Sequence, residues 1–270
     1  MPAATAFDVW GSGAIVAAVV AGFVAERRWP LRRRVRPPGE RLTINAAMVA
    51  LAALALRLAM IPAALAVAAA GERAGVGLLR WVELPAAVTA VLGFLLLDWT
   101  VYVWHRLNHR VPLLWRFHVV HHTDLDLDVS TAFRFHAGEL LLSVGWRSAQ
   151  IAVLGVGPGL FLVYEAAMEA ATAFHHSNWR LPPPLERALN AAFVTPRMHG
   201  LHHSVNERET NANWSVIFSW WDRLHRTLRL AVPDAAPTIG LPAYRDAREL
   251  GVRFLLALPF MRQREAFTPR

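Results

Sequence analysis

The chain has 270 residues, of which 55% are hydrophobic and 18% charged, a more apolar balance than that of ordinary soluble domains. Its 28 basic residues are all arginine and outnumber 20 acidic residues, so the formal net charge is +8. The absence of cysteine excludes disulfides, thiolate zinc sites, cysteine-ligated iron–sulfur clusters and a cysteine nucleophile. All twelve histidines lie between His105 and His225.

An apolar run from about Val9 to Val24 predicts the first membrane span, with Trp10 and Trp29 at its two interfaces. About 28 Å of helix separates these tryptophans, which matches a hydrocarbon core. Arginines follow the run rather than precede it, so we expect a retained anchor and not a signal peptide. The loop over 27–41 holds seven arginines, opposed only by Glu40 within it and by Glu26 just before it. No aromatic platform is interleaved, so the loop marks the cytoplasmic side rather than a nucleic-acid site.

Two further spans are predicted, from Asn45 to Ala70 and from Leu84 to Trp104. Arg57 lies inside the first of these and is costly there unless it faces protein or water. The charges in 71–83 sum to zero, which suits the far side of the membrane and places the N-terminus outside.

Residues 137–174 are mostly apolar and are interrupted by a glycine-rich break at 154–159. We expect a hairpin of two short legs that enters and leaves from one side, because histidines flank it on both sides. The predicted fold is an all-α polytopic membrane protein with about three spans, this hairpin and a histidine-rich helical cap on the cytoplasmic face. Its predicted parts are 1–89 (spans and basic loop), 90–230 (catalytic region) and 231–270 (cytoplasmic tail).

The histidines form three clusters with helical spacing. These are His105 and His109; His118, His121 and His122; and His199, His202 and His203. Positions i, i+3 and i+4 share a helix face, so each cluster is expected to aim its imidazoles at one point. One ion takes about three to six ligands, and eight imidazoles therefore suit two ions. Imidazole is a ligand for iron, zinc, copper and nickel.

The pattern around these clusters resembles the fatty acid hydroxylase / sterol desaturase superfamily of integral-membrane di-iron enzymes, over about residues 90–227. Beyond the three clusters, the matching residues are Asp98, Tyr102, Arg106, Pro112, Leu114, Trp115, Ser130, Thr131, Arg134, His136, Glu139, Phe174, His175, His176, Ser177, Asn178, Thr195, Pro196, Arg197, Met198, Asn213, Trp221, Asp222, Arg223 and Leu224. Two departures stand out: His225-Arg226-Thr227 replaces the usual Phe-Gly-Thr, and Ala137 stands where proline is common.

The resemblance implies two iron ions with O₂ as co-substrate, and hydroxylation or desaturation of a fatty acyl chain, a sterol or another isoprenoid lipid. It also implies an external electron donor of the ferredoxin or cytochrome type. The basic cytoplasmic face suits an acidic donor. An integral protein of a bacterial inner membrane is expected, with no nucleic-acid partner.

The expected metal ligands are His105, His109, His118, His121, His122, His176, His199, His202 and His203. His175 is about 100° around a helix from His176, and we favour His176. Further residues are candidates for a ligand or for a group that orients one: His136, His175, Asp98, Arg134, Glu139 and Asp222, with Asp124 and Glu165 considered beside them. His225 is expected to be structural, and no catalytic residue is predicted beyond the metal ligands.

Two other functions stay open. A zinc-dependent membrane hydrolase or isomerase would use the same histidines. A non-catalytic metal-binding or transport protein would need ionisable residues along a path across the bilayer, whereas these histidines cluster beyond the end of a span.

Overall fold

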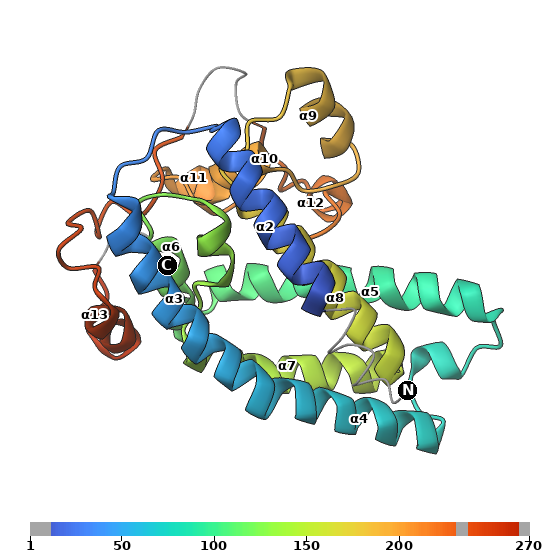
Figure 1. Ribbon diagram of the computed structural model, residues 1–270. Helices are drawn as coiled ribbons and strands as arrows, with labels where there is room; N and C mark the ends of the chain where they lie inside the picture. Colours follow the sequence, from blue (N-terminus) through green and yellow to red (C-terminus); the bar gives the residue numbers. More distant parts are fainter. Residues whose placement is uncertain (1–11, 231–236, 265–270) are drawn as a thin grey trace.

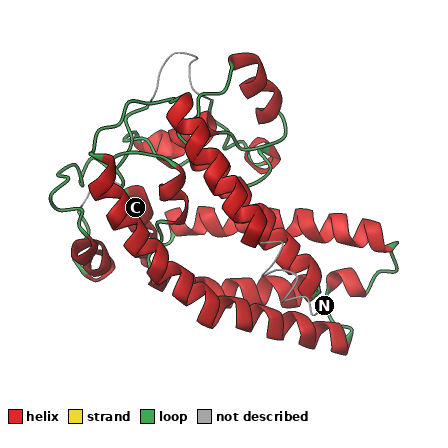
Figure 2. Cartoon of the chain, in the orientation of Figure 1, coloured by secondary structure: helices red, strands yellow, loops and turns green. Residues whose placement is uncertain are grey.

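The computed structural model describes residues 12–230 and 237–264, so Trp10 and the start of the first predicted span lie outside the described residues. The described chain is helical, with isolated β-bridges and no strand (Figure 2). The long helices are α2 (Ser12–Arg28), α3 (Pro38–Ala55), α4 (Ile61–Ala74), α5 (Ala86–Arg110), α6 (Pro112–His122), α7 (Ala137–Leu154) and α8 (Pro158–His176). The short ones are α9 (Pro183–Asn190), α10 (Pro196–His202), α11 (Glu207–Thr210), α12 (Trp220–Leu224) and α13 (Val252–Ala257).

Two helical stretches are long and apolar enough to cross a membrane, Pro38–Arg80 with mean hydropathy 2.1 and Ala86–Arg110 with 1.8. They contain the second predicted span and all but the first two residues of the third. A π-helical turn, Leu56–Met60, joins α3 to α4 and includes Arg57. Only 22% and 28% of the most apolar part of these two stretches is buried inside the protein, whereas the core helix of a soluble protein is mostly buried. Over the described part of the chain, α2 is not among the stretches that meet these criteria.

Prolines and glycines set many of the helix boundaries. A proline stands in the first turn of α3, α6, α8, α9 and α10, where its missing N–H costs nothing. Helices α4 and α7 end at Gly75 and Gly155, whose φ angles of 65° and 76° lie in the left-handed region that glycine adopts without strain. The sequence thus encodes where these helices begin and end.

The predicted hairpin corresponds to α7 and α8, but its legs are not short. They contain 18 and 19 residues, or about 27 and 29 Å of helix. Their tip at Gly155 reaches the loop between α4 and α5, where a Cβ on Gly77 would lie 2.2 Å from the Gly155 Cα. The histidine-bearing ends of α5 and α8 lie away from this tip, toward the short helices (Figure 1).

We expect Gly77→Ala to destabilise the protein by about 1–3 kcal/mol, because its φ of 124° disfavours any side chain and the added methyl would strike Gly155. Thermal unfolding in detergent measures the effect. Gly39→Ala is the control, since a Cβ there meets nothing within 4 Å. Equal unfolding temperatures for the two variants would show that the close approach is absent.

Two apolar cores hold the helices together. One lies among α4, α5, α7 and α8, and includes Leu97, Phe161 and Tyr164. The other joins Met48 of α3 and Val119 of α6 to the C-terminal part of the chain between Leu241 and Leu258. The three parts predicted from the sequence therefore share a core, and the segment expected as a tail packs on α3 and α6.

Candidate metal centre

The structure brings all nine expected ligands together in two groups. The first group is His105, His109, His118, His122 and His202, and the second is His121, His176, His199 and His203. Within each group the candidate ligand nitrogens lie within 4.8 Å of one another. Helices α5, α6, α8 and α10 supply eight of them and His203 directly follows α10, and all but the partly exposed His105 are buried.

The groups do not coincide with the sequence clusters, which corrects the expectation that each cluster aims at one point. His121 and His122 are neighbours on α6 and belong to different groups, and His202 and His203 are divided in the same way. Successive helical residues point about 100° apart, so an adjacent pair faces two centres. The His122 and His203 rings stack with centroids 4.4 Å apart, where the two groups meet.

The nitrogen atoms in these groups fit a cation. The Nε2 atom of His176 lies 3.0 Å from the Nε2 atoms of both His121 and His199, and His199 Nε2 lies 3.1 Å from His203 Nε2. In the first group, Nε2 of His109, His118, His122 and His202 is buried without a hydrogen-bond partner. Buried polar atoms are normally satisfied, and converging imidazole nitrogens are satisfied by a metal ion.

Burial and neighbouring imidazoles hold the pKa values of His121, His122, His199, His202 and His203 well below the ordinary value. The rings are therefore neutral at pH 7. A neutral imidazole keeps the lone pair that binds a metal.

Four of the histidines are oriented through their other nitrogen. Nδ1 of His105 lies 2.9 Å from the Trp214 carbonyl, and Nδ1 of His202 lies 2.8 Å from the Ala212 carbonyl. His176 Nδ1 is 2.9 Å from the carbonyl of Thr172 in its own helix. Donation from Nδ1 fixes the tautomer and leaves Nε2 free for a metal. Sequence reasoning missed these carbonyls, because any residue type supplies one.

Glu139, one of the candidate carboxylates, contacts the fourth histidine, His118. Its Oε1 atom lies 2.8 Å from His118 Nδ1 and also accepts a hydrogen bond from Asn108. Glu139 lies in the first turn of α7, so its contact with His118 links the start of the hairpin to α6 beside the first histidine group.

Replacing this carboxylate tests the role. We expect Glu139→Gln to weaken metal binding by about 10–100-fold, because an amide is a poorer acceptor for the His118 N–H. Metal titration of the purified apoprotein measures the affinity. Glu207→Gln, at an exposed position of α11, is the control. Wild-type affinity in the Glu139 variant would exclude the role.

His175 and His136 lie outside both groups. The His175 ring packs beside that of His199, with the ring centroids 4.2 Å apart. His136 accepts a hydrogen bond from the Gly138 N–H through Nδ1, and its Nε2 lies 3.3 Å from the Leu256 carbonyl. His136 thus begins α7 and contacts the C-terminal segment.

Asp98 was a candidate for a ligand or for a group that orients one, but it accepts hydrogen bonds from donors outside the histidine groups. These are Trp221 Nε1 at 2.7 Å, the Phe218 N–H at 3.2 Å and the Tyr164 hydroxyl at 3.2 Å. The carboxylate therefore joins α5 to α8 and α12. These donors satisfy the Asp98 carboxylate, which therefore does not orient a histidine; backbone carbonyls orient His105 and His202 instead.

Asp222 supports the backbone segment that contacts two of the histidines. It accepts hydrogen bonds from the N–H groups of Trp214 and Ser215 and from the Thr227 hydroxyl. It thereby holds the segment whose carbonyls meet His105 and His202. His225 lies outside both groups: its Nε2 accepts a hydrogen bond from Trp99, and its ring stacks on Tyr102.

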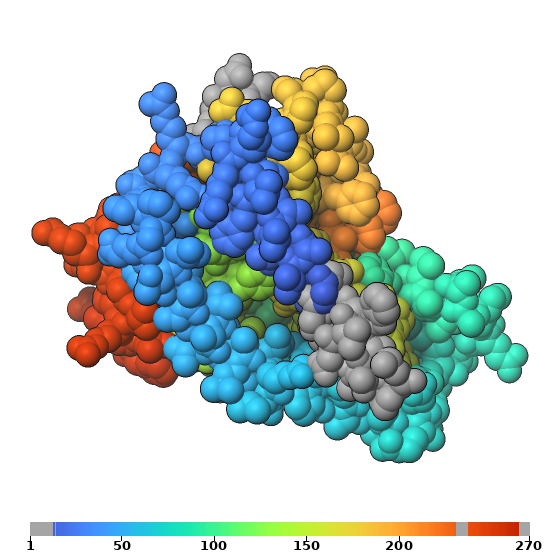
Figure 3. All heavy atoms as spheres, viewed as in Figure 1, coloured from blue at the N-terminus to red at the C-terminus, as the bar shows by residue number. Residues whose placement is uncertain are grey.

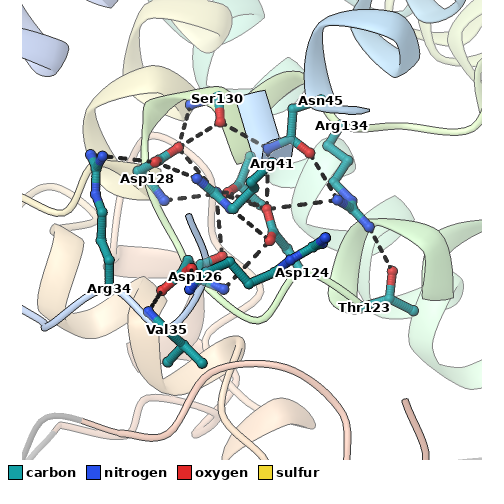
Figure 4. A network of polar contacts seen from close by, with 12 residues as sticks. Arg34, Val35, Arg41, Asn45, Thr123, Asp124, Asp126, Asp128, Ser130 and Arg134 are labelled. Atoms are coloured by element: carbon teal, nitrogen blue, oxygen red, sulfur yellow. Dashed lines mark hydrogen bonds and ion pairs between the residues drawn. The ribbon is translucent and has the colours of Figure 1, made fainter. Parts of the chain in front are cut away.

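Arg134 and Asp124 belong to a buried polar network behind the second histidine cluster (Figure 4). Arg41 of α3 donates to both oxygens of Asp124 at 2.8 Å and pairs with Asp128. Arg134 donates to Asn45 and Thr123. Burial alone would raise the pKa of Asp124, but Arg41 and Arg134 outweigh it and hold the pKa well below its usual range. The network ties the loop after α6 to α3.

An apolar cavity of about 280 Å³ begins at the histidines and runs between α3, α7 and α8. Val49, Phe133, Phe135 and Leu140 are part of its wall, and His118, His121 and His176 stand at one end. Figure 3 shows a hollow in the surface between α2 and α3, with atoms from the middle of the chain below it. The histidine centre is thus joined to a space suited to an apolar molecule.

Fold and site together define a helical membrane protein with a buried, histidine-rich centre beside an apolar cavity. Residues 90–227 match the family model described as fatty acid hydroxylase, and the chain belongs to this family. The superfamily resemblance of the sequence is thereby confirmed.

Three relatives illustrate the family. The chain is 32% identical over 181 residues to ornithine lipid hydroxylase OlsE of Rhizobium tropici, covering 66% of this chain and 52% of the relative. It is 28% identical over 188 residues to cholesterol 25-hydroxylase of Rattus norvegicus, covering 64% and 62%. It is 31% identical over 151 residues to alkylglycerol monooxygenase of Danio rerio, covering 55% and 32%. The matches thus span less than two thirds of these relatives, and no solved structure matches the chain significantly.

Proposed function

We propose that the protein is a membrane-bound, O₂-dependent di-iron oxidoreductase that hydroxylates or desaturates a lipid. The observation that carries the proposal is the pair of buried histidine groups at one end of an apolar cavity. Five and four imidazoles suit two ions, whereas a structural zinc site closes with four ligands in all. The relatives named as lipid hydroxylases and monooxygenases support the same reaction class.

The nine histidines would hold the iron ions, which supply O₂ activation and oxidation of an unactivated C–H bond when bound. The carbonyls of Ala212, Trp214 and Thr172, together with Glu139, hold four of the imidazole rings in fixed orientations. The cavity excludes water and positions the substrate carbon near the histidines. A lipid would enter sideways from the bilayer through the hollow between α2 and α3.

The metal site is proposed to face the cytoplasm of a bacterial cell. The arginine-rich loop after α2 lies beside the third histidine cluster, since a Cβ on Gly200 would lie 2.3 Å from Nη1 of Arg32. Short loops rich in arginine stay on the cytoplasmic side. The same face suits an acidic ferredoxin or cytochrome as the electron donor.

We expect turnover with the native donor to fall when ionic strength rises from about 0.05 to 0.5 M, because salt screens the attraction between basic loop and acidic donor. Steady-state rates at several donor concentrations measure this. A rate independent of salt would contradict electrostatic docking and leave the lipid reaction untouched.

Comparative lipid profiling tests the function itself. Cells with and without the protein are grown under oxygen-18 gas, and their lipids are compared by mass spectrometry. A hydroxylase should add one labelled oxygen to a lipid, and a desaturase should remove two hydrogens. Identical profiles in cells that contain the iron-loaded protein would contradict the proposal.

A further inference from the structure

The cavity has a second polar region that the histidines do not account for. Helix α8 presents Glu165, Glu169, Thr172 and His176 at spacings of four, three and four residues, and helix α7 presents Glu139, Ser143 and Arg147 at spacings of four. Such spacings place each set on one helix face. All seven residues line the cavity. Each helix therefore runs from the metal centre to a charged group farther along the same wall.

The charged groups are one ion pair and one additional carboxylate. Arg147 Nη1 lies 3.0 Å from Glu165 Oε1, and both side chains are more than nine-tenths buried. Glu169 lines the same cavity and interacts electrostatically with Glu165 and Arg147, but it forms no direct hydrogen bond or ion pair with the residues that the structure describes. A carboxylate within a membrane helix is costly, and it marks a functional site when it faces a cavity.

This polar region is distant from the histidines. Glu169 precedes His176 by seven residues of α8, and Arg147 follows Glu139 by eight residues of α7. The helical rise converts these separations to about 10 and 12 Å. Apolar side chains such as Leu140 and Met168 also line the cavity.

We propose that Glu169, supported by the Arg147–Glu165 pair, is a subsite for a hydrogen-bond donor on the lipid, a hydroxyl or ammonium group about 10 Å from the carbon at the metal centre. Two carboxylates and one guanidinium leave an excess of negative charge in the cavity. This excess attracts a hydrogen-bond donor of the lipid and repels a lipid carboxylate or phosphate. The lipid is thus an alcohol or amine that points its apolar part at the histidines. Naming this ligand as substrate rests on the proposed function, whereas the binding preference does not.

The test is a binding measurement on the full chain, purified with whatever metal it holds, in lipid nanodiscs. The probes are dodecanol, dodecylamine, dodecanoate and dodecane, which share one chain length and differ at one end. Ligand-dependent shifts of the unfolding temperature at several probe concentrations give relative affinities. The variants are Glu169→Leu and Glu169→Gln, with Glu83→Leu, an exposed glutamate outside the cavity, as the matched control.

The wild type should bind dodecanol and dodecylamine about tenfold more tightly than dodecane, as expected for one added hydrogen bond, and dodecanoate more weakly than dodecanol. Glu169→Leu should abolish the preference. Glu169→Gln should retain the alcohol preference, because its carbonyl still accepts, and reduce that for the amine. Glu83→Leu should match the wild type.

Equal binding of alcohol and alkane by the wild type would overturn the proposal, as would an unchanged preference in both Glu169 variants. If Glu169→Leu fails to fold, the amine-to-alcohol ratio of Glu169→Gln decides the question. Failure of the proposed function would instead show as absent iron or absent turnover while the binding preference persists.

Discussion

His121→Ala should lower the iron content from about two ions per chain to about one and reduce lipid oxidation by more than about 100-fold. His121 belongs to the second histidine group, which has four members, and its Nε2 faces that of His176 at 3.0 Å. Removing a ligand leaves three imidazoles, and loss of even an outer hydrogen-bond partner of a ligand costs 10–100-fold. Elemental analysis and turnover of the purified variant measure both effects.

His136→Ala is the matched control, because His136 lies outside both groups and bonds to Gly138 and Leu256. It should keep the full iron content. A His121 variant with full metal and full activity would show that the second group is not a metal site. Iron loss in the His136 variant alone would show that the ligands are assigned wrongly.

Arg41→Met should destabilise the protein by about 3–5 kcal/mol, because it removes the guanidinium closest to the buried Asp124 and Asp128 and leaves them only the longer ion pairs with Arg134 and Arg34. The loop after α6 should loosen, and its neighbour His122 should hold metal less well. Thermal unfolding in detergent and metal retention during dialysis measure the two effects.

Arg33→Met is the control, since Arg33 is exposed in the same basic loop and should change stability by less than about 0.5 kcal/mol. Arg41→Lys should fall between the two, because an ammonium cannot reproduce the paired contacts with Asp124. Equal stability of the Arg41 and Arg33 variants would show that the network of Figure 4 does not support the fold.

Much of the centre was predictable from residue spacing. The i, i+3 and i+4 pattern identified eight of the grouped histidines, and the family resemblance added His176. The division of His121 from His122 was not foreseen, because a shared cluster suggested a shared target while neighbouring residues on a helix point to different sides. The orienting carbonyls of Ala212, Trp214 and Thr172 carry no sequence signal, since every residue has one.

The fold shows the same contrast. Apolar runs predicted the helices that contain the second and third spans, and the glycine-rich stretch predicted the turn at Gly155. The length of the hairpin was missed, because the glycine-rich break and the flanking histidines predict a return to one side but not how far each leg extends. The charged residues of these legs, the Arg147–Glu165 pair and Glu169, line the cavity. Long-range partners such as Arg41 with Asp124 depend on packing that no local pattern reveals.

Metal analysis of the purified, active protein tests the central claim most directly. The account predicts about two iron ions per chain, bound by the two histidine groups, with activity that is lost on chelation and restored by iron. A fully active protein that contains zinc and no iron would contradict it.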